Sequence, residues 1–198
     1  MQDELSDTDF TVIAVAIQED PEGLAPFLEG ITFPVLLDRE HVLTELYAIS
    51  NVPTVIWIDA DGTIVRPNSV AVSTDTFVDF TGVNCEEDLV ALRRWIREGV
   101  VPVSPEQALT AVADLSDDEI DARLEFRVAA HLRRSGDEAG AAGHFERAGQ
   151  LAPHDFTIRR AMMPLTGVDP FGEAFFELWA EFQAAGSPYH GFGEPIRD

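Results

Sequence analysis

The chain has 198 residues, with 36 acidic and 13 basic side chains, and its formal net charge is −23. Every basic residue is an arginine, because the sequence contains no lysine. This charge repels phosphate backbones and anionic lipid surfaces, which argues against nucleic-acid and membrane-surface partners. The 45% apolar content and 13 phenylalanines indicate a folded protein rather than an acidic disordered tail.

The sequence shows no membrane-spanning or targeting signal. No apolar run reaches the roughly 18 to 20 residues that a bilayer requires. The first residues are acidic where a signal peptide would be basic. We therefore expect a cytoplasmic location without membrane insertion. A single cysteine excludes an internal disulfide and a cysteine-based structural zinc site.

The acidity predicts a salt dependence. Like-charge repulsion destabilises a compact chain, and the Debye length falls from ~10 Å at 0.1 M salt to ~3 Å at 1 M. The melting temperature should therefore rise between these potassium chloride concentrations, as followed by circular dichroism. Such a surface suits a salt-rich cytoplasm, whereas a GC-rich genome would also explain arginine in place of lysine. A flat or falling melting temperature would contradict the first explanation.

The first third of the chain alternates between extended and helical patterns. The apolar, β-branched run 10–17 predicts a strand buried on both faces. Asp20 is expected to cap the start of a helix, and an extended segment is expected to follow at 33–37. Asp38 is expected to cap a further helix. The residues expected to point inward from these two helices are Leu24, Phe27, Leu28, Val42, Leu43, Leu46 and Tyr47.

The next segment predicts a β-hairpin over 54–66, with Gly62 at a turn position that favours positive φ. Residues 67–83 predict an irregular loop with a short strand. A helix should run from Cys85 to Glu98, and Gly99 should end it.

Beyond Gly99 every pattern is helical. Ser104 and Ser116 each open a capping box, and Asp137 caps another helix. The last helix is expected to start at Asp169. We therefore predict two domains, an α/β unit at 1–100 and an all-α unit at 101–198.

The α/β unit resembles the thioredoxin fold on two stretches. The first is Phe-Pro-Val-Leu-Leu-Asp at 33–38, and the second is the Val-Pro-Thr strand with its Asp-Gly hairpin at 51–65. The resemblance is closest to the second half of TlpA/ResA-type redoxins and covers about residues 5–98. It implies a thiol–disulfide oxidoreductase ancestry and a role in cell redox homeostasis.

The resemblance also implies a substrate-binding loop at Val52, Pro53 and Thr54. In that family the matching proline is cis, and the backbone of the preceding residue pairs with an extended substrate segment. We predict that the Val52–Pro53 bond is cis, the alternative being a trans proline that begins an edge strand.

One departure from the family decides the expected activity. The family's first strand and its helix with Trp-Cys-x-x-Cys are missing, so no catalytic residue is assigned. Either the start is truncated, which we favour, or a redoxin lost its catalytic unit. Cys85 is a candidate free thiol, but Glu86, Glu87 and Asp88 raise its pKa and favour an incidental role. Enzymatic activity therefore stays uncertain.

The second half resembles one tetratricopeptide (TPR) unit over 122–155. Small residues at Ala129, Ala141 and Ala148 would let two antiparallel helices approach, with Phe145 between them. The other matching positions are Val128 and Leu132. A lone unit needs neighbouring helices to bury its faces.

The last helix carries an aromatic stripe, which we expect to cap the repeat pair and dock it on the α/β unit rather than form a peptide groove. The stripe comprises Phe171, Phe175, Leu178, Trp179 and Phe182. The five histidines show no ligand spacing, so neither a metal site nor a cofactor is expected.

Two functions follow from these patterns. The first is a redoxin-family protein that is non-catalytic as given and binds a protein or peptide partner, with self-association as an alternative. Its missing strand and helix should leave Val12, Ile13, Val15 and Ile17 exposed beside Val52 and Thr54. The second is a TPR-type protein-interaction module in which the α/β half is scaffold.

Overall fold

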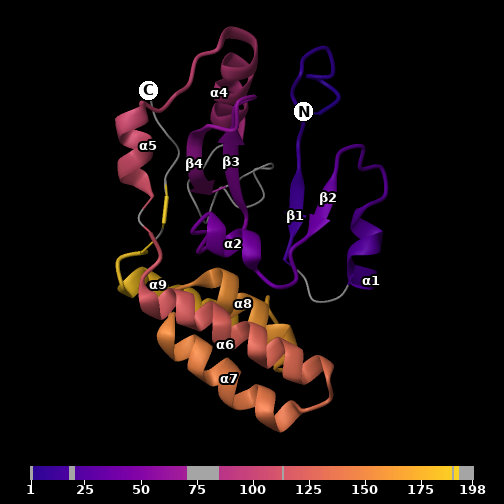
Figure 1. The fold of residues 1–198 in the computed structure, drawn as a ribbon, viewed down its shortest axis with the longest axis vertical. Coiled ribbons are helices and arrows are strands. Elements are labelled where there is room, and N and C mark those ends of the chain that lie inside the picture. Colours follow the sequence, from indigo (N-terminus) through magenta and orange to yellow (C-terminus); the bar gives the residue numbers. More distant parts are fainter. Residues whose placement is uncertain (1, 18–20, 71–84, 113, 189, 192–198) are drawn as a thin grey trace.

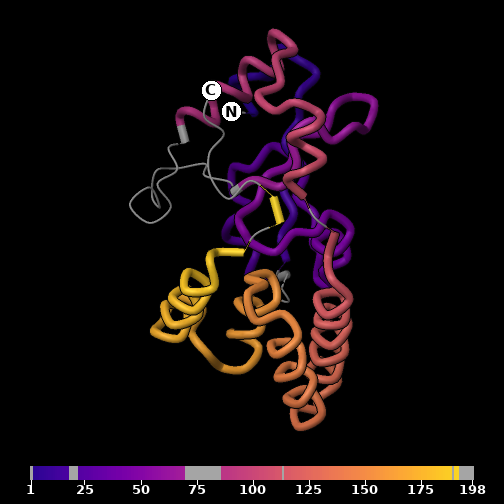
Figure 2. The backbone as a smooth tube through the Cα atoms, turned by 90° about the vertical axis from the view of Figure 1, so that its left-hand side faces the viewer, coloured from indigo at the N-terminus to yellow at the C-terminus, as the bar shows by residue number. Residues whose placement is uncertain are grey.

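The structure is a computed structural model that describes residues 2–17, 21–70, 85–112, 114–188 and 190–191. It has a small β region of two separate sheets in the N-terminal part, followed by a mostly helical C-terminal part (Figure 1). Figure 2 shows the same division after a quarter turn, with the helices from 117 onward grouped below the strands and α9 at one edge. The predicted combination of a mixed N-terminal region and a helical remainder is confirmed at this level. The boundary at residue 100 stays a prediction.

The strands form two pairs that are not joined to each other. Strands β1 (Ala14–Ala16) and β2 (Val35–Leu37) pair in parallel. Strands β3 (Thr54–Ile58) and β4 (Ile64–Val70) form the predicted antiparallel hairpin, with Gly62 at φ +88° in its turn. β4 continues to Val70, so the start of the predicted loop 67–83 is strand, and its remainder lies outside the described residues. Across Figure 1 the strands stand in the order β4, β3, β1, β2.

The helices between and after the strands follow the capping signals closely. Their bounds are α1 (Pro21–Leu24), the 3₁₀ turn η1 (Ala25–Phe27), α2 (Val42–Leu46), α4 (Cys85–Glu98), α5 (Pro105–Ala111), α6 (Asp117–Arg134), α7 (Glu138–Leu151), α8 (Phe156–Leu165) and α9 (Glu173–Ala184).

The predicted caps at Ser104, Ser116, Asp137 and Asp38 are present, whereas the one at Asp20 lies outside the described residues. The side chains of Ser104 and Ser116 complete capping boxes, and Asp137 accepts a hydrogen bond from the Gly140 N–H. The Asp38 carboxylate accepts hydrogen bonds from the first backbone N–H groups of α2, at 2.8 Å from Val42 N. α9 starts four residues after the predicted Asp169.

Burial in the N-terminal part departs from the prediction. The expected doubly buried strand 10–17 shortens to the three residues of β1, which are all half-buried, and Ile13 is 57% exposed. Phe27 is 70% exposed and Leu46 is 76% exposed, so neither points inward as predicted. An apolar face needs a second layer to cover it, and the described residues place none over Phe27 and Leu46.

The hairpin is buried on one side by α4. The Trp57 and Trp95 rings stack with centroids 5.2 Å apart. The Arg66 guanidinium lies 4.6 Å from the Trp57 ring and pairs with Asp88 at 2.8 Å. This contact fixes α4 against the β3–β4 sheet.

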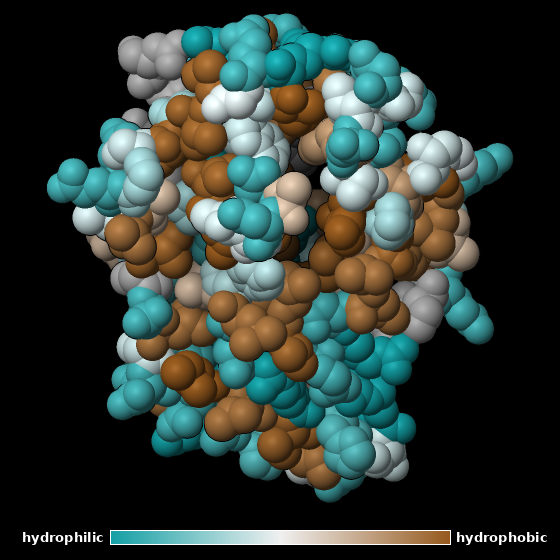
Figure 3. Space-filling view, turned by 45° about the horizontal axis from the view of Figure 1, so that its top comes forward, coloured by the Kyte–Doolittle hydropathy of each residue, from teal (hydrophilic) through white to brown (hydrophobic). Residues whose placement is uncertain are grey.

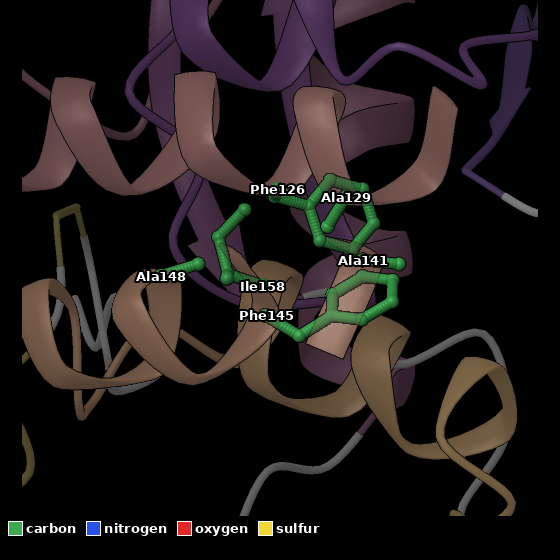
Figure 4. Packing of buried hydrophobic residues seen from close by; sticks show 6 residues of the cluster. All are labelled: Phe126, Ala129, Ala141, Phe145, Ala148 and Ile158. Atoms are coloured by element: carbon green, nitrogen blue, oxygen red, sulfur yellow. The ribbon is translucent and has the colours of Figure 1, made fainter. Parts of the chain in front are cut away.

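The main core lies in the helical part. The antiparallel pair α6 and α7 closes over Phe126, Ala129, Ala141, Phe145 and Ala148, all essentially buried, and Ile158 of α8 completes the cluster (Figure 4). The small residues allow close approach of the helices, as the sequence predicted.

The aromatic stripe of α9 packs on α8. Leu178 and Phe182 are buried against Phe156 and Met163, whereas Phe171 is 71% exposed. α9 therefore packs on α8, while the predicted docking of the stripe on the α/β unit stays a prediction. The described contacts between the helical part and the α/β part include α5 against β4, side chains of α6, the start of α8 and His190.

Candidate functional site

The predicted binding loop lies where the chain enters β3. The Val52–Pro53 peptide bond is cis, which confirms the prediction. Val52 and Thr54 are half-buried, and Pro53 is exposed. The Thr54 hydroxyl donates a 2.8 Å hydrogen bond to the Asn51 carbonyl, which holds the loop in place.

Strand β1 has one edge that no described strand occupies. The Ala14 N–H donates to Pro34 and the Ala16 carbonyl accepts from Asp38 N, so the backbone groups of Ala14 and Ala16 point toward β2. Because alternate residues point to opposite sides of a strand, the N–H and C=O groups of Ile13 and Val15 point away from β2.

Strand β3 is open in the same way. The Asp59 N–H donates to the Thr63 carbonyl, and Trp57 is paired with Arg66 of β4. Ile58 is in register with Ile64 of β4, next to the hydrogen-bonded pair Asp59 and Thr63, so the pair Ile58–Ile64 is a non-hydrogen-bonded one. The N–H and C=O groups of Ile58, and those of Ile56 two residues earlier, therefore point away from β4. In the part of the chain that the structure describes, no ladder joins β3 to β1. We call these two edges, at Ile13/Val15 and Ile56/Ile58, the strand gap.

An apolar groove lies beside β1. It is an open hollow of about 300 Å³ between β1, β2 and α2, lined by Val15, Leu36, Leu37, Asp38, Val42, Leu43 and Leu46. Several of these side chains are strongly exposed, with Leu36 at 51% and Val42 at 49%. Figure 3 shows the surface hollowed between groups of hydrophobic side chains. An apolar surface of this kind marks an interaction site or an association hazard.

The expected exposed patch is present only in part. Ile13 is strongly exposed, whereas Val12, Val15 and Ile17 are half-buried like Val52.

A buried polar cluster joins the two parts of the molecule, and sequence reasoning missed it. Arg123 of α6 is fully buried and its Nη2 lies 2.7 Å from the Asp155 carboxylate. The same guanidinium donates to the carbonyls of Ile49 and Glu119 at 2.9 and 3.0 Å. The Phe156 N–H donates to the Ser50 carbonyl at 2.8 Å.

Burial sets the ionisation of this cluster. It raises the pKa of Asp155, and the Arg123 charge offsets part of that rise. The Asp155 carboxylate also accepts hydrogen bonds from Thr157 N and Ile158 N, so it caps α8. The only sequence signal was a capping aspartate after Pro153, since nothing marked Arg123 as buried.

His41 lies at the same junction. Its ring is 1% exposed and packs on Phe126 with centroids 4.6 Å apart. Burial lowers its pKa from 6.5 to about 4, the Arg123 and Arg127 charges act in the same direction, and Asp38 opposes them. Arg127 also donates to the His41 carbonyl.

The remaining predicted candidates contribute less. Cys85 is the first residue of α4, as predicted, but its side chain lies outside the described residues. Within the described ranges no group of three or more His, Cys, Asp or Glu side chains is placed to share a metal ion. No described helix combines the length and the hydrophobicity needed to cross a membrane.

Comparisons with protein-family models, curated proteins and solved structures find no match to this chain.

Proposed function

We propose that this chain is a non-catalytic protein-interaction module, with an incomplete thioredoxin-like α/β half and a TPR-like helical half. Its α/β half binds an extended peptide along the open edge of β3, beside Val52, Pro53 and Thr54. One observation carries the proposal: among the described strands, β1 and β3 each have an edge without a partner strand, and an exposed apolar groove lies beside β1.

Strand addition is the recognition mode that such an edge supports. Main-chain hydrogen bonds to an unpaired strand supply affinity, and pockets for alternate side chains supply specificity. Proteins normally cover or blunt open edges, because these edges otherwise recruit other chains. Among the described residues β3 offers this edge at Ile56 and Ile58, and the exposed side chains of Ile58 and Ile64 add apolar surface beside it.

The proposal excludes disulfide chemistry by the chain alone. Exchange needs an attacking thiolate, and two-cysteine reductases need a second thiol to resolve the mixed disulfide, whereas this chain has one cysteine. We expect no reduction of insulin by this chain above the background of dithiothreitol in buffer. Turbidity at 650 nm follows the reaction. Activity that disappears in Cys85→Ser would overturn this expectation and make Cys85 a nucleophile.

Val52→Asp tests the binding loop. The substitution places a carboxylate beside the β3 edge and should weaken peptide binding by about tenfold, a loss of roughly 1.4 kcal/mol. Binding is measured by fluorescence anisotropy with labelled extended peptides. Thermal unfolding of the variant checks that the helical half stays folded. Unchanged affinity would contradict a role for the loop.

A second candidate function has its own supporting observation. Ile120, Leu124 and Val128 of α6 are 37%, 48% and 43% exposed and recur at four-residue spacing. This apolar stripe is suited to binding a partner helix. Val128→Asp should then impair partner binding while Val52→Asp leaves it unchanged, which is the reverse of the outcome that the first function predicts.

A further inference from the structure

The relative direction of the two open edges defines what the strand gap can hold. Strand β2 leads into α2, so β2 and its parallel neighbour β1 run toward α2. Strand β3 follows α2 and runs away from it (Figure 1). β1 and β3 are therefore antiparallel, and a single strand between them that is parallel to β1 is antiparallel to β3.

One inserted strand would satisfy both edges. It would accept and donate hydrogen bonds at Ile13 and Val15 on one side, and at Ile56 and Ile58 on the other. The result is a five-stranded mixed sheet in the order β4, β3, insert, β1, β2, a common type of sheet. The two edges match a segment of about five residues, the usual strand length.

The surroundings of the gap indicate the chemistry of the insert. The side chains of Ile13 and Ile58 are 57% and 44% exposed, and the apolar groove continues from Val15, so an apolar segment would bury them. Because β1 and β3 are antiparallel, the start of β1 and the end of β3 lie at the end of the gap where the inserted strand begins. Asp9 precedes β1 and Asp59 follows β3, and both residues are exposed. Lysine or arginine just before the inserted strand would meet these carboxylates.

A second copy of this chain is a poor occupant. Each copy carries a net charge of −23, and two copies repel each other, whereas a basic segment is attracted.

Resting on the proposed function, we propose that the strand gap binds one extended segment of a partner protein. The segment is apolar, about five residues long and preceded by basic residues, and it enters parallel to β1 and antiparallel to β3.

The test uses the whole chain and the peptide Lys-Lys-Val-Thr-Val-Thr-Val. One control peptide replaces both lysines with glutamates, and the other carries N-methyl groups on its central amides. Affinity is measured by fluorescence anisotropy, and amide hydrogen exchange is followed by NMR. We expect the lysine peptide to bind about tenfold more tightly than either control. It should slow exchange at Ile13, Val15, Ile56 and Ile58.

A pair of variants checks the location. Ile13→Asp places a carboxylate at the β1 edge and should weaken binding of the lysine peptide by about tenfold. Leu109→Asp on α5 is the matched control, since Leu109 is 82% exposed and lies outside the gap. The Leu109→Asp variant should bind the lysine peptide with the same affinity as the parent protein. Equal losses in both variants would overturn the assignment to the gap.

The remaining outcomes separate the inference from the proposed function. Protection of Ile56 and Ile58 alone means that a peptide adds to β3 without insertion, so the proposed function holds and the inference fails. If none of the three peptides binds or slows amide exchange, in the parent or in Val52→Asp, both the proposed function and the inference are rejected. A dimer in analytical ultracentrifugation that Ile13→Asp dissociates makes a second copy the occupant and overturns the inference.

Discussion

Replacement of Asp155 by alanine is expected to destabilise the protein by about 3–5 kcal/mol, because it leaves the Arg123 charge buried without its partner. Arg123 and Asp155 are 0% and 3% exposed, so water does not compensate either charge. The same change removes the cap of α8, since Asp155 accepts hydrogen bonds from Thr157 N and Ile158 N. A loss of this size is a large fraction of the total stability of most domains.

Urea unfolding of two further variants separates the charge from the cap. Asp155→Asn keeps an acceptor for the backbone of α8 but removes the negative charge, so it should retain part of the lost stability. The double variant Arg123→Met with Asp155→Leu removes both charges and should be more stable than Asp155→Ala. A loss below about 1 kcal/mol for Asp155→Ala would show that the buried pair is not a main stabilising contact.

The second large effect is a loss of stability in acid that depends on His41. Its pKa in the folded protein is lowered from 6.5 to about 4, so between these pH values the unfolded state binds a proton that the folded state does not. Stability should therefore be complete above pH 6.5 and fall as the pH decreases toward 4. The fall attributable to His41 is about 3 kcal/mol.

His41→Gln provides the comparison, because glutamine is polar and does not titrate. Urea unfolding at a series of pH values between 7 and 4 should show a shallower pH dependence for the variant than for the parent. The groups facing His41 are Asp38, Arg123 and Arg127, and all three remain in both proteins. Parallel stability curves would mean that His41 is not the group responsible.

A large share of the local structure was predictable from sequence. The capping boxes at Ser104 and Ser116 depend on side chains within a few residues, so local chemistry is sufficient to place them. The same holds for the hairpin turn at Gly62 and for α4, whose bounds agree with the prediction. The small residues Ala129 and Ala141 likewise indicated the close pairing of α6 and α7.

Burial in the N-terminal part could not be predicted in this way. An apolar pattern indicates which face of an element is suited to burial, but a second layer is needed to cover that face. Around Ile13, Phe27 and Leu46 the described residues provide no such layer, so these side chains stay exposed. The strand gap could not be predicted either, because the sequence pattern of a strand does not show which strands pair with it in the folded protein.

The sequence by itself determined the starts of α4, α5, α6 and α7, the hairpin turn and the negative charge, since these follow from neighbouring residues and from composition. Only the tertiary structure decided that Arg123, Asp155 and His41 meet at one buried junction. In the sequence, Arg123 lies 82 residues after His41, and Asp155 lies 32 residues after Arg123. Contacts over such distances depend on the packing of α6 and α8 against the α/β part, where exclusion of water makes each unpaired charge costly.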